Sequence, residues 1–329
     1  MKKIRVSING FGRIGRAFFK VARQNPSIEI VAVNDLGAKE GMEYLLTYDT
    51  VYGRSDASLL GVTYLSEKDP AKLPWKELAI DVVVESTGFF ASAEGANLHI
   101  SAGAKRVVVT APIKSESPEC KTVLMGLNEE AIKDCHITSN ASCTTNAASP
   151  VIAILDATIG IEKALLNTVH AYTATQVLVD GPAGKKGLRE GRAAAQNIIP
   201  SSTGAAVAVT KAYPNLAGKF DGISLRVPVI CGSIADITFV GKRDTSAEEV
   251  NDILRSAAKE KHWQGIFAVS EDELVSSDIV GRPEGAIAEL SMTRVVGGNL
   301  VKVLAWYDNE MGYTHTLVAH VIKVGKLLT

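Results

Sequence analysis

Short runs of β-branched and other apolar residues alternate with longer amphipathic segments over the first 140 residues. Polar residues rarely interrupt the runs, which is typical of parallel strands that are covered on both faces of a sheet. Helical spacing at residues 16–24 and 93–102 indicates crossover helices. This part of the chain is therefore predicted to form a doubly wound α/β fold. Its predicted strands are residues 4–8, 28–34, 81–85, 106–110 and 136–140.

The hydrophobic pattern changes after Pro150, where a helical segment is followed by longer strands that alternate between apolar and polar positions. Alternation predicts strands with one buried face, and antiparallel pairing suits such strands. Thr245 and Ser246 precede two acidic residues, which is typical of a helix start. That helix is predicted to run to about residue 261, and a last helix over residues 309–328 is expected to pack on the first domain. The predicted strands are residues 163–172, 222–229, 234–242 and 299–307.

A length of 329 residues exceeds what one hydrophobic core usually serves, so two domains are expected. We place one in residues 1–142 and 309–329, and an α+β domain with a largely antiparallel sheet in residues 143–308. The net charge of −1 gives no reason to expect a nucleic acid or a membrane surface as the main partner. No apolar run suggests a signal peptide or a spanning helix. Four cysteines without C-x-x-C spacing favour a reducing, cytoplasmic location and predict no metal site.

A glycine-rich turn, G-F-G-R-I-G at residues 10–15, follows the first predicted strand and opens a helix. Such a turn lets pyrophosphate approach the unpaired N–H groups of a helix N-terminus. Asp35 lies 20 residues beyond Gly15, at the end of the second predicted strand, where a carboxylate can bind ribose hydroxyls. With Leu36 and Gly37 next to it, and no arginine, NAD is favoured over NADP. The alternative is a glycine turn that binds no ligand.

Cys143 lies in S-N-A-S-C-T-T-N, where a predicted strand ends and a helix begins. A helix N-terminus and a nearby imidazolium can lower the pKa of a thiol, so a reactive thiolate is expected here. The alternative is an inert buried cysteine, which is the interpretation for Cys120, Cys135 and Cys231. A metal site built from Cys135, His136 and Cys143 lacks a fourth ligand.

His170 is the candidate base, because it ends a strand-like run in T-V-H-A-Y-T. The other histidines are interpreted as structural or surface groups. A thiolate that attacks an aldehyde makes its carbon ready to release hydride, and the resulting thioester can be collected by phosphate. Two anion sites are then needed. Candidates are the hydroxyl-rich run at residues 201–206, before an apolar helical segment, and Arg226, although Thr203 could be only a helix cap and Arg226 only a surface charge.

Five motifs together, N-G-F-G-R-I-G-R, S-N-A-S-C-T-T-N, T-V-H-A-Y-T, P-S-S-T-G-A-A and W-Y-D-N-E-M-G-Y, resemble the glyceraldehyde-3-phosphate dehydrogenase family. The resemblance spans nearly the whole chain. It implies an NAD-dependent, phosphorylating oxidation of D-glyceraldehyde 3-phosphate, with Cys143 as nucleophile and His170 as base. It also implies a homotetramer, in which residues 173–192 form a loop that reaches a neighbouring subunit's cofactor site.

The same resemblance implies binding residues. For the substrate phosphate these are Thr173 and Arg226, and for inorganic phosphate Ser142, Thr144, Thr203 and Gly204. For NAD they are Gly10, Gly12, Arg13, Ile14, Gly15 and Asp35, with Asn309 at the carboxamide and Tyr313 nearby.

Two alternatives stay open at this point. The related erythrose-4-phosphate dehydrogenase shares the cofactor and thiol motifs but hydrolyses its thioester, and H-A-Y-T and S-T-G-A-A fit the phosphorylating enzyme better. A catalytically silent NAD-binding scaffold, with RNA as a partner, is a hypothesis of another class. The near-neutral net charge gives no sign of the basic surface that RNA binding needs. The candidate thiol, base and anion sites argue against a catalytically inactive protein.

Overall fold

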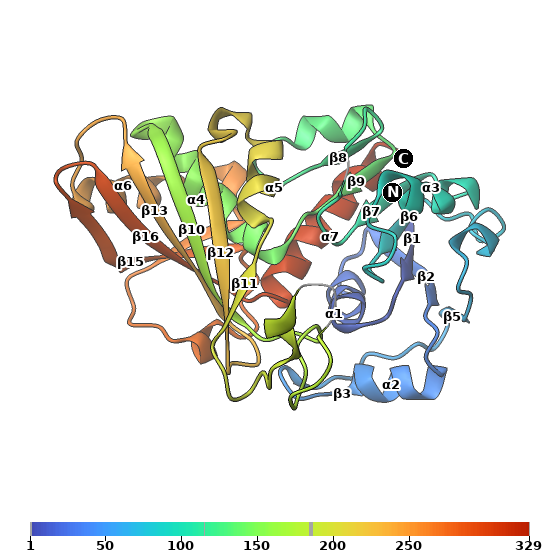
Figure 1. The fold of residues 1–329 in the computed structure, drawn as a ribbon. Helices are drawn as coiled ribbons and strands as arrows, with labels where there is room; N and C mark the ends of the chain where they lie inside the picture. Colours follow the sequence, from blue (N-terminus) through green and yellow to red (C-terminus); the bar gives the residue numbers. More distant parts are fainter. Residues whose placement is uncertain (1, 115, 184–186, 329) are drawn as a thin grey trace. The chain divides into compact units, whose positions relative to one another are not determined.

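A computed structural model describes residues 2–114, 116–183 and 187–328. The chain divides into two compact units, of which the first comprises Met1–Ser142 and Thr314–Thr329 and the second Cys143–Tyr313 (Figure 1). Among the residues in those ranges, no helix combines the length and the apolar character that a membrane crossing requires.

The first unit is built on a seven-stranded sheet in the order β5-β2-β1-β6-β7-β9-β8, and every pair in it is parallel. All five strands predicted here are confirmed. The two strands that were not predicted, β5 and β8, have three residues each, too few to show a period. The strands are β1 Ile4–Asn9, β2 Ile28–Asn34, β5 Thr63–Leu65, β6 Val82–Glu85, β7 Arg106–Val109, β8 Cys120–Thr122 and β9 Ile137–Ser139.

The connections of the first unit include three α-helices and two short 3-10 turns. Both predicted crossover helices are confirmed, and α1 begins three residues earlier than expected, directly after Gly12. The elements are α1 Arg13–Ala22, α2 Lys39–Thr47, α3 Ala93–Ser101, η1 Pro70–Lys72 and η2 Glu129–Asp134, with a small hairpin of β3 Tyr48–Asp49 and β4 Gly53–Arg54.

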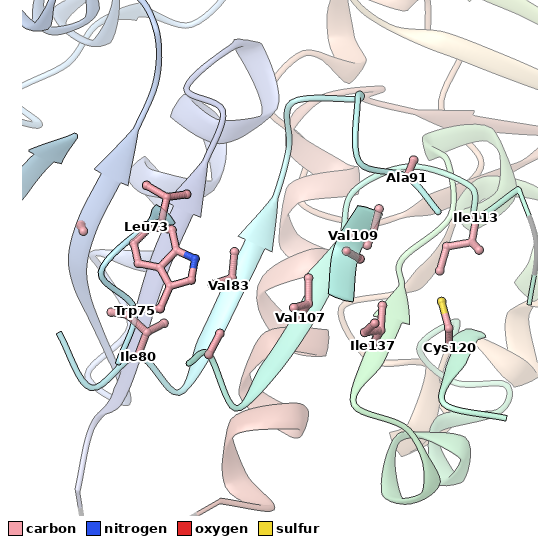
Figure 2. Close-up of a cluster of buried hydrophobic side chains, with 13 residues drawn as sticks. Leu73, Trp75, Ile80, Val83, Ala91, Val107, Val109, Ile113, Cys120 and Ile137 are labelled. Carbon is pink, nitrogen blue, oxygen red and sulfur yellow. The ribbon is translucent and has the colours of Figure 1, made fainter. Parts of the chain in front are cut away.

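Apolar side chains from neighbouring strands pack in rows on the sheet of the first unit. Val83, Val107, Ile137 and Cys120 are paired in register across β6, β7, β9 and β8, and Figure 2 shows them in a row, with Trp75 at the Val83 end. Each of these side chains is at most 4% exposed. Burial of both sheet faces explains why the strands read as unbroken apolar runs.

The second unit contains another seven-stranded sheet, in the order β11-β12-β10-β13-β16-β15-β14. The β10–β12 and β14–β15 pairs are parallel and the other four are antiparallel, so the largely antiparallel sheet is confirmed. The sequence analysis missed β11, β14 and β15. The strands are β10 Ile161–Ala171, β11 Ile199–Ser202, β12 Phe220–Val227, β13 Ser233–Gly241, β14 Phe267–Ser270, β15 Ala286–Val296 and β16 Leu300–Tyr307.

Helices pack on one face of this sheet, and the side chains of Leu165 and Ile223 are exposed on the other. Buried and half-buried positions alternate along all of β13, as expected for a strand with one covered face. The helix α6 begins after Ser246, whose hydroxyl accepts from the Glu249 N–H at 3.1 Å, and it ends about four residues before the predicted end. The helices are α4 Cys143–Thr158, α5 Ala205–Ala212, α6 Ala247–Ala257 and α7 Met311–Lys326, and the 3-10 turns are η3 Leu188–Gly191, η4 Pro214–Leu216, η5 Lys261–Trp263 and η6 Ser276–Ile279.

The chain returns to the first unit at Thr314, whereas the sequence analysis placed this boundary at residue 309. The first turn of α7 is anchored in the second unit. Asn309 Oδ1 accepts from the Gly232 N–H at 3.1 Å, and Gly312 packs so closely on Glu284 that a Cβ would lie 2.4 Å from its carbonyl oxygen. These contacts explain the shift of the boundary by a few residues.

His320, on the part of α7 that belongs to the first unit, is a fully buried imidazole. Its Nδ1 donates to Asn140 Oδ1 at 3.1 Å, and its Nε2 has no hydrogen-bond partner among the described residues. Burial lowers the pKa of His320 from its usual 6.5 to about 3. The folded protein therefore keeps this side chain neutral at pH values where the unfolded chain binds a proton.

The lowered pKa makes stability depend on acid. The contribution of His320 is complete above about pH 6.5 and is lost as the pH falls towards 3, by about 1.4 kcal/mol per pH unit. His320→Asn, which keeps a donor for Asn140, is expected to reduce the slope of unfolding free energy against pH by about one proton between those limits. Urea unfolding at a series of pH values measures this slope. His262→Asn, at an exposed histidine, is the control; equal slopes for His320→Asn and wild type would contradict the expectation.

Candidate active site

Cys143 is the first residue of α4, and its side chain is half-buried. The turn before it contains Ala141 with a φ of 52°, a left-handed conformation that is uncommon for a residue with a Cβ. The Ala141 N–H donates to Ser139 Oγ at 2.9 Å, which holds this strained turn at the end of β9. The predicted junction of a strand and a helix is thus present.

The structure brings Cys143 and His170 together across 27 residues of sequence. The Sγ atom lies 3.4 Å from His170 Nε2, within hydrogen-bonding distance for sulfur. His170 is the second-last residue of β10 and is 4% exposed. A thiol and an imidazole at this separation can exchange a proton directly.

Arg226 lies beside the same imidazole because β12 runs parallel to β10 and pairs Arg226 with His170. Its Nη1 is 2.6 Å from His170 Nδ1 and 3.3 Å from the Ala171 carbonyl oxygen. His170 Nδ1 is also 2.6 Å from that carbonyl oxygen. When Nδ1 carries the proton and donates it to the carbonyl, Nε2 is left to accept the proton of Cys143, and Arg226, which can only donate, bonds the same carbonyl oxygen and not Nδ1. Arg226 then supplies a fixed positive charge at the end of the two strands.

The pKa of the Cys143 thiol is raised, not lowered as the sequence analysis expected. Burial is the largest cause, and Arg226 and hydrogen bonds from Thr144 act in the opposite direction without overcoming it. Loss of water disfavours the thiolate more than the start of α4 favours it. The imidazole of His170, 3.4 Å from Sγ, is placed to accept the proton of this thiol.

Tyr307, which the sequence analysis did not single out, supports this pair from β16. Its hydroxyl lies 2.8 Å from Thr144 Oγ1 and 2.7 Å from Thr168 Oγ1, and its ring packs edge-on against His170 at 5.9 Å. Burial raises the pKa of Tyr307 far above its usual value, so the phenol stays neutral. The hydroxyl of Thr144, a predicted phosphate ligand, is buried in this contact. The sequence feature that could have identified Tyr307 is the W-Y-D-N motif, in which Tyr307 follows Trp306.

The other predicted anion-binding residues lie in the segments that follow β11, β10 and β9. Thr203 and Gly204 lie between β11 and α5, where the predicted helix start is present, and Thr203 Oγ1 accepts from the Ala205 N–H at 3.2 Å. Gly204 is exposed, and no atom lies within 4 Å of a Cβ built on it. Thr173 follows β10, and its N–H donates to Gln176 Oε1 at 2.7 Å. Ser142 is the last residue of the first unit.

Asn309 is 6% exposed and has a defined amide orientation. Its Oδ1 accepts from the Gly232 N–H and from Ser233 Oγ, each at 3.1 Å. Because a backbone N–H can only donate, the oxygen must face Gly232, and the amino group is left as a donor for a ligand. Tyr313, in the first turn of α7, is 3% exposed.

A cavity of about 590 Å³ lies at the carboxyl ends of the first unit's strands, beside the glycine turn. Gly10 has a φ of 92°, and a Cβ there would lie 2.6 Å from the Thr87 nitrogen, while one on Gly15 would lie 2.2 Å from the Gly10 carbonyl oxygen. Gly12 has no atom within 4 Å of its Cβ position. Gly10 and Gly15 thus allow the tight turn, and Gly12 leaves open space at the start of α1.

Asp35 lines this cavity at the end of β2. Its Oδ2 accepts from the Phe11 N–H at 2.7 Å and its Oδ1 from the Gly37 N–H at 2.8 Å. Each oxygen keeps a lone pair for a ribose hydroxyl. Arg13 directs its guanidinium to Asp49 at 3.0 Å, so its part at the pyrophosphate would come from its backbone, as for its neighbour Ile14.

The segment after β6 also lines the cavity and was missed by the sequence analysis. Thr87 donates its N–H to Glu85 Oε1 at 2.8 Å, and Glu85 is buried and bonded to His99 at 3.0 Å. The sequence feature that could have identified this segment is the polar S-T-G that follows a buried strand.

In residues 2–114, 116–183 and 187–328 no group of three or more His, Cys, Asp or Glu residues could hold a metal ion.

Comparisons with known proteins agree with this geometry. The family model described as glyceraldehyde 3-phosphate dehydrogenase, NAD binding domain, matches residues 4–93, and that of the C-terminal domain matches residues 142–309. The glyceraldehyde-3-phosphate dehydrogenase of Streptomyces coelicolor is 45% identical over 99% of both chains. That of Geobacillus stearothermophilus is 44% identical over 96% of both, and that of Mycobacterium avium 44% over 99% of both.

Proposed function

Because the chain belongs to the glyceraldehyde-3-phosphate dehydrogenase family, an NAD-dependent oxidoreductase family, we propose that it oxidises D-glyceraldehyde 3-phosphate to 1,3-bisphosphoglycerate with inorganic phosphate. The reaction passes through a thioester on Cys143 and serves glycolysis and gluconeogenesis. The observation that carries the chemistry is the 3.4 Å separation of Cys143 Sγ and His170 Nε2 beside Arg226.

The reaction begins with transfer of the Cys143 proton to His170 Nε2. The thiolate attacks the aldehyde carbon, and the Cys143 N–H at the start of α4 is a donor for the developing oxyanion. The imidazolium of His170 gives its proton to this oxygen to form the hemithioacetal, and the neutral His170 then takes the proton back, which favours departure of hydride. NAD, when bound, accepts that hydride. The acyl group remains on sulfur until phosphate attacks it and restores the thiolate.

The glycine turn fits a dinucleotide, since Gly10 and Gly15 permit the tight turn and Gly12 leaves open space beside the start of α1. We assign the pyrophosphate to the N–H groups of residues 10–15, the adenosine ribose to Asp35, and the nicotinamide carboxamide to the Asn309 amino group, with Tyr313 nearby. This gives the dinucleotide-binding role to residues 1–142 with the C-terminal segment, and the catalytic role to the remainder.

Two groups of residues are proposed for the two phosphates. Thr173 and Arg226 bind the substrate phosphate, and they stand at the ends of the paired strands β10 and β12 near His170. The inorganic phosphate is bound by Thr203 and Gly204 at the start of α5, where N–H groups and open space are present, together with Ser142. Thr144 completes this set by exchanging its hydrogen bond to Tyr307 for one to the phosphate.

The reaction is tested by following NADH absorbance with the triose phosphate and NAD, with and without phosphate. Sustained turnover is expected only with phosphate or arsenate, and without either one the reaction should stop after one NADH per site. Multiple turnover without an acceptor would instead show hydrolysis of the thioester. Preferred oxidation of erythrose 4-phosphate under the same conditions would replace the proposed substrate.

Replacing Asp35 is expected to change the choice of cofactor. Asp35→Ser loses a charged hydrogen bond to ribose and the charge that repels a 2′-phosphate, so kcat/KM for NAD should fall by about tenfold to a hundredfold. The same quantity for NADP should rise. Initial rates with each cofactor measure the ratio, and Glu40→Gln, at an exposed carboxylate of α2, is the control. An unchanged ratio in Asp35→Ser would remove Asp35 from the ribose site.

A cytoplasmic homotetramer is the proposed form of the enzyme. The sheet of the second unit exposes Leu165, Ile223 and Leu300, and the loop after β10 exposes Leu178 and Leu188. Apolar surface of this kind is typical of protein interfaces. All four cysteines are free thiols, as suits a reducing compartment. Analytical ultracentrifugation tests the assembly, and a monomer at micromolar concentration would refute it.

A further inference from the structure

Glu190 is a buried carboxylate in the turn η3, 3% exposed, in a loop that also contains Gln176. Its Oε1 accepts the hydroxyl proton of Ser201 at 2.5 Å, and its Oε2 accepts from the side-chain amide of Gln176. Within the part of the chain that the structure describes, Glu190 forms no ion pair with Lys, Arg or His. A buried carboxyl group is costly unless it is hydrogen-bonded, and Ser201 and Gln176 provide these bonds.

The two partners of Glu190 belong to the two segments assigned to phosphate binding. Gln176, itself 9% exposed, accepts from the backbone N–H of Thr173 at 2.7 Å and from its hydroxyl at 3.3 Å. Ser201 lies in β11, two residues before Thr203 and three before Gly204. One carboxylate therefore connects the loop of the substrate phosphate to the strand that leads into the inorganic-phosphate site.

A carboxylate cannot itself bind phosphate, because both are anions and repel each other. Placing one behind two anion sites weakens their positive potential, and only a geometric role offsets that effect. We propose that Glu190 is a positioning residue that holds the Thr173 segment and the Thr203–Gly204 segment at the spacing that both phosphates need. This inference rests on the proposed function.

Glu190→Ala tests the proposal, because it removes both hydrogen bonds at once. KM for glyceraldehyde 3-phosphate and KM for inorganic phosphate are both expected to rise by about fivefold to tenfold, as for loss of a hydrogen bond of roughly 1 kcal/mol at each segment. The NADH burst with glyceraldehyde, which has no phosphate group, uses Cys143 and His170 but neither anion site. Its rate is expected to stay within about twofold of wild type.

Glu190→Gln is the matched variant. Its amide retains one oxygen acceptor and gains a donor for Ser201 Oγ, so both KM values should return to within about threefold of wild type. Glu162→Ala, at an exposed glutamate of β10, is the control for loss of a carboxylate. Rescue by glutamine with an intact glyceraldehyde burst supports positioning.

Three results would overturn the inference: unchanged KM values in Glu190→Ala, a rise in only one of them, or an equal loss of the glyceraldehyde burst. The last would indicate general damage to the fold. Failure of the proposed function is recognised separately, since wild type itself would then form no NADH from the triose phosphate.

Discussion

Replacing Cys143 with serine is expected to lower kcat by at least about a thousandfold, because the step that makes the acyl-enzyme would lose its nucleophile. A serine hydroxyl is a far weaker acid than a thiol, and an imidazole 3.4 Å away cannot ionise it to the same extent. Oxygen esters also transfer their acyl group to phosphate less readily than thioesters. Steady-state NADH formation and the size of the first-turnover burst measure the effect.

The matched control for this substitution is Cys135→Ser. Cys135 is buried, and its Sγ donates to the Ala131 carbonyl at 2.9 Å, a bond that a hydroxyl can keep. This variant should retain near wild-type activity. If Cys143→Ser kept more than about a tenth of wild-type kcat, the attacking group would have to lie elsewhere. Alkylation with iodoacetamide gives a second readout, since modification of Cys143 should parallel the loss of activity.

Replacing His170 with asparagine is expected to lower kcat by about a hundredfold to ten-thousandfold, the usual contribution of a general base. Asparagine keeps a donor for the Ala171 carbonyl but offers no group to take the Cys143 proton. Burial raises the pKa of this thiol, so without its imidazolium partner the thiolate forms only in alkaline solution. The residual activity should therefore rise with pH through the range where wild type is already constant.

The pH dependence of kcat/KM and of the alkylation rate measures this effect, with His262→Asn as the control at an exposed histidine. A His170→Asn profile parallel to that of wild type would show that His170 does not control the ionisation of Cys143. In that case Arg226, the remaining positive group beside the site, would have to stabilise the thiolate alone.

The pattern of apolar residues was sufficient for most of the strands. Unbroken runs in the first unit and alternating runs in the second reflect local burial, which repeats at a fixed period along a strand. The strand β15 was missed although it has eleven residues, because a register shift between Glu289 and Arg294 interrupts its alternation. Strands of three residues, such as β5 and β8, are too short to show an alternating pattern. Their extended conformation depends on pairing with the neighbouring strands of the sheet.

The candidate site likewise combines residues that the sequence identified with contacts that only the fold creates. Sequence alone identified Cys143 at the start of a helix and His170 at the end of a strand, but it could not show that they meet. Their contact depends on how β10 and α4 pack in the second unit, and Arg226 reaches His170 only through the parallel register of β10 and β12. The buried connection through Glu190 was equally invisible, since its partners are 14 and 11 residues away.

What the sequence determined by itself was therefore local: strand and helix periods, a turn that only glycine permits, and a thiol at a helix start. The tertiary structure decided which of these residues face one another and whether the pKa of the thiol rises or falls. The physical reason is that register and desolvation depend on contacts between residues far apart in the chain, and the burial of Cys143 outweighs the local influence of its helix.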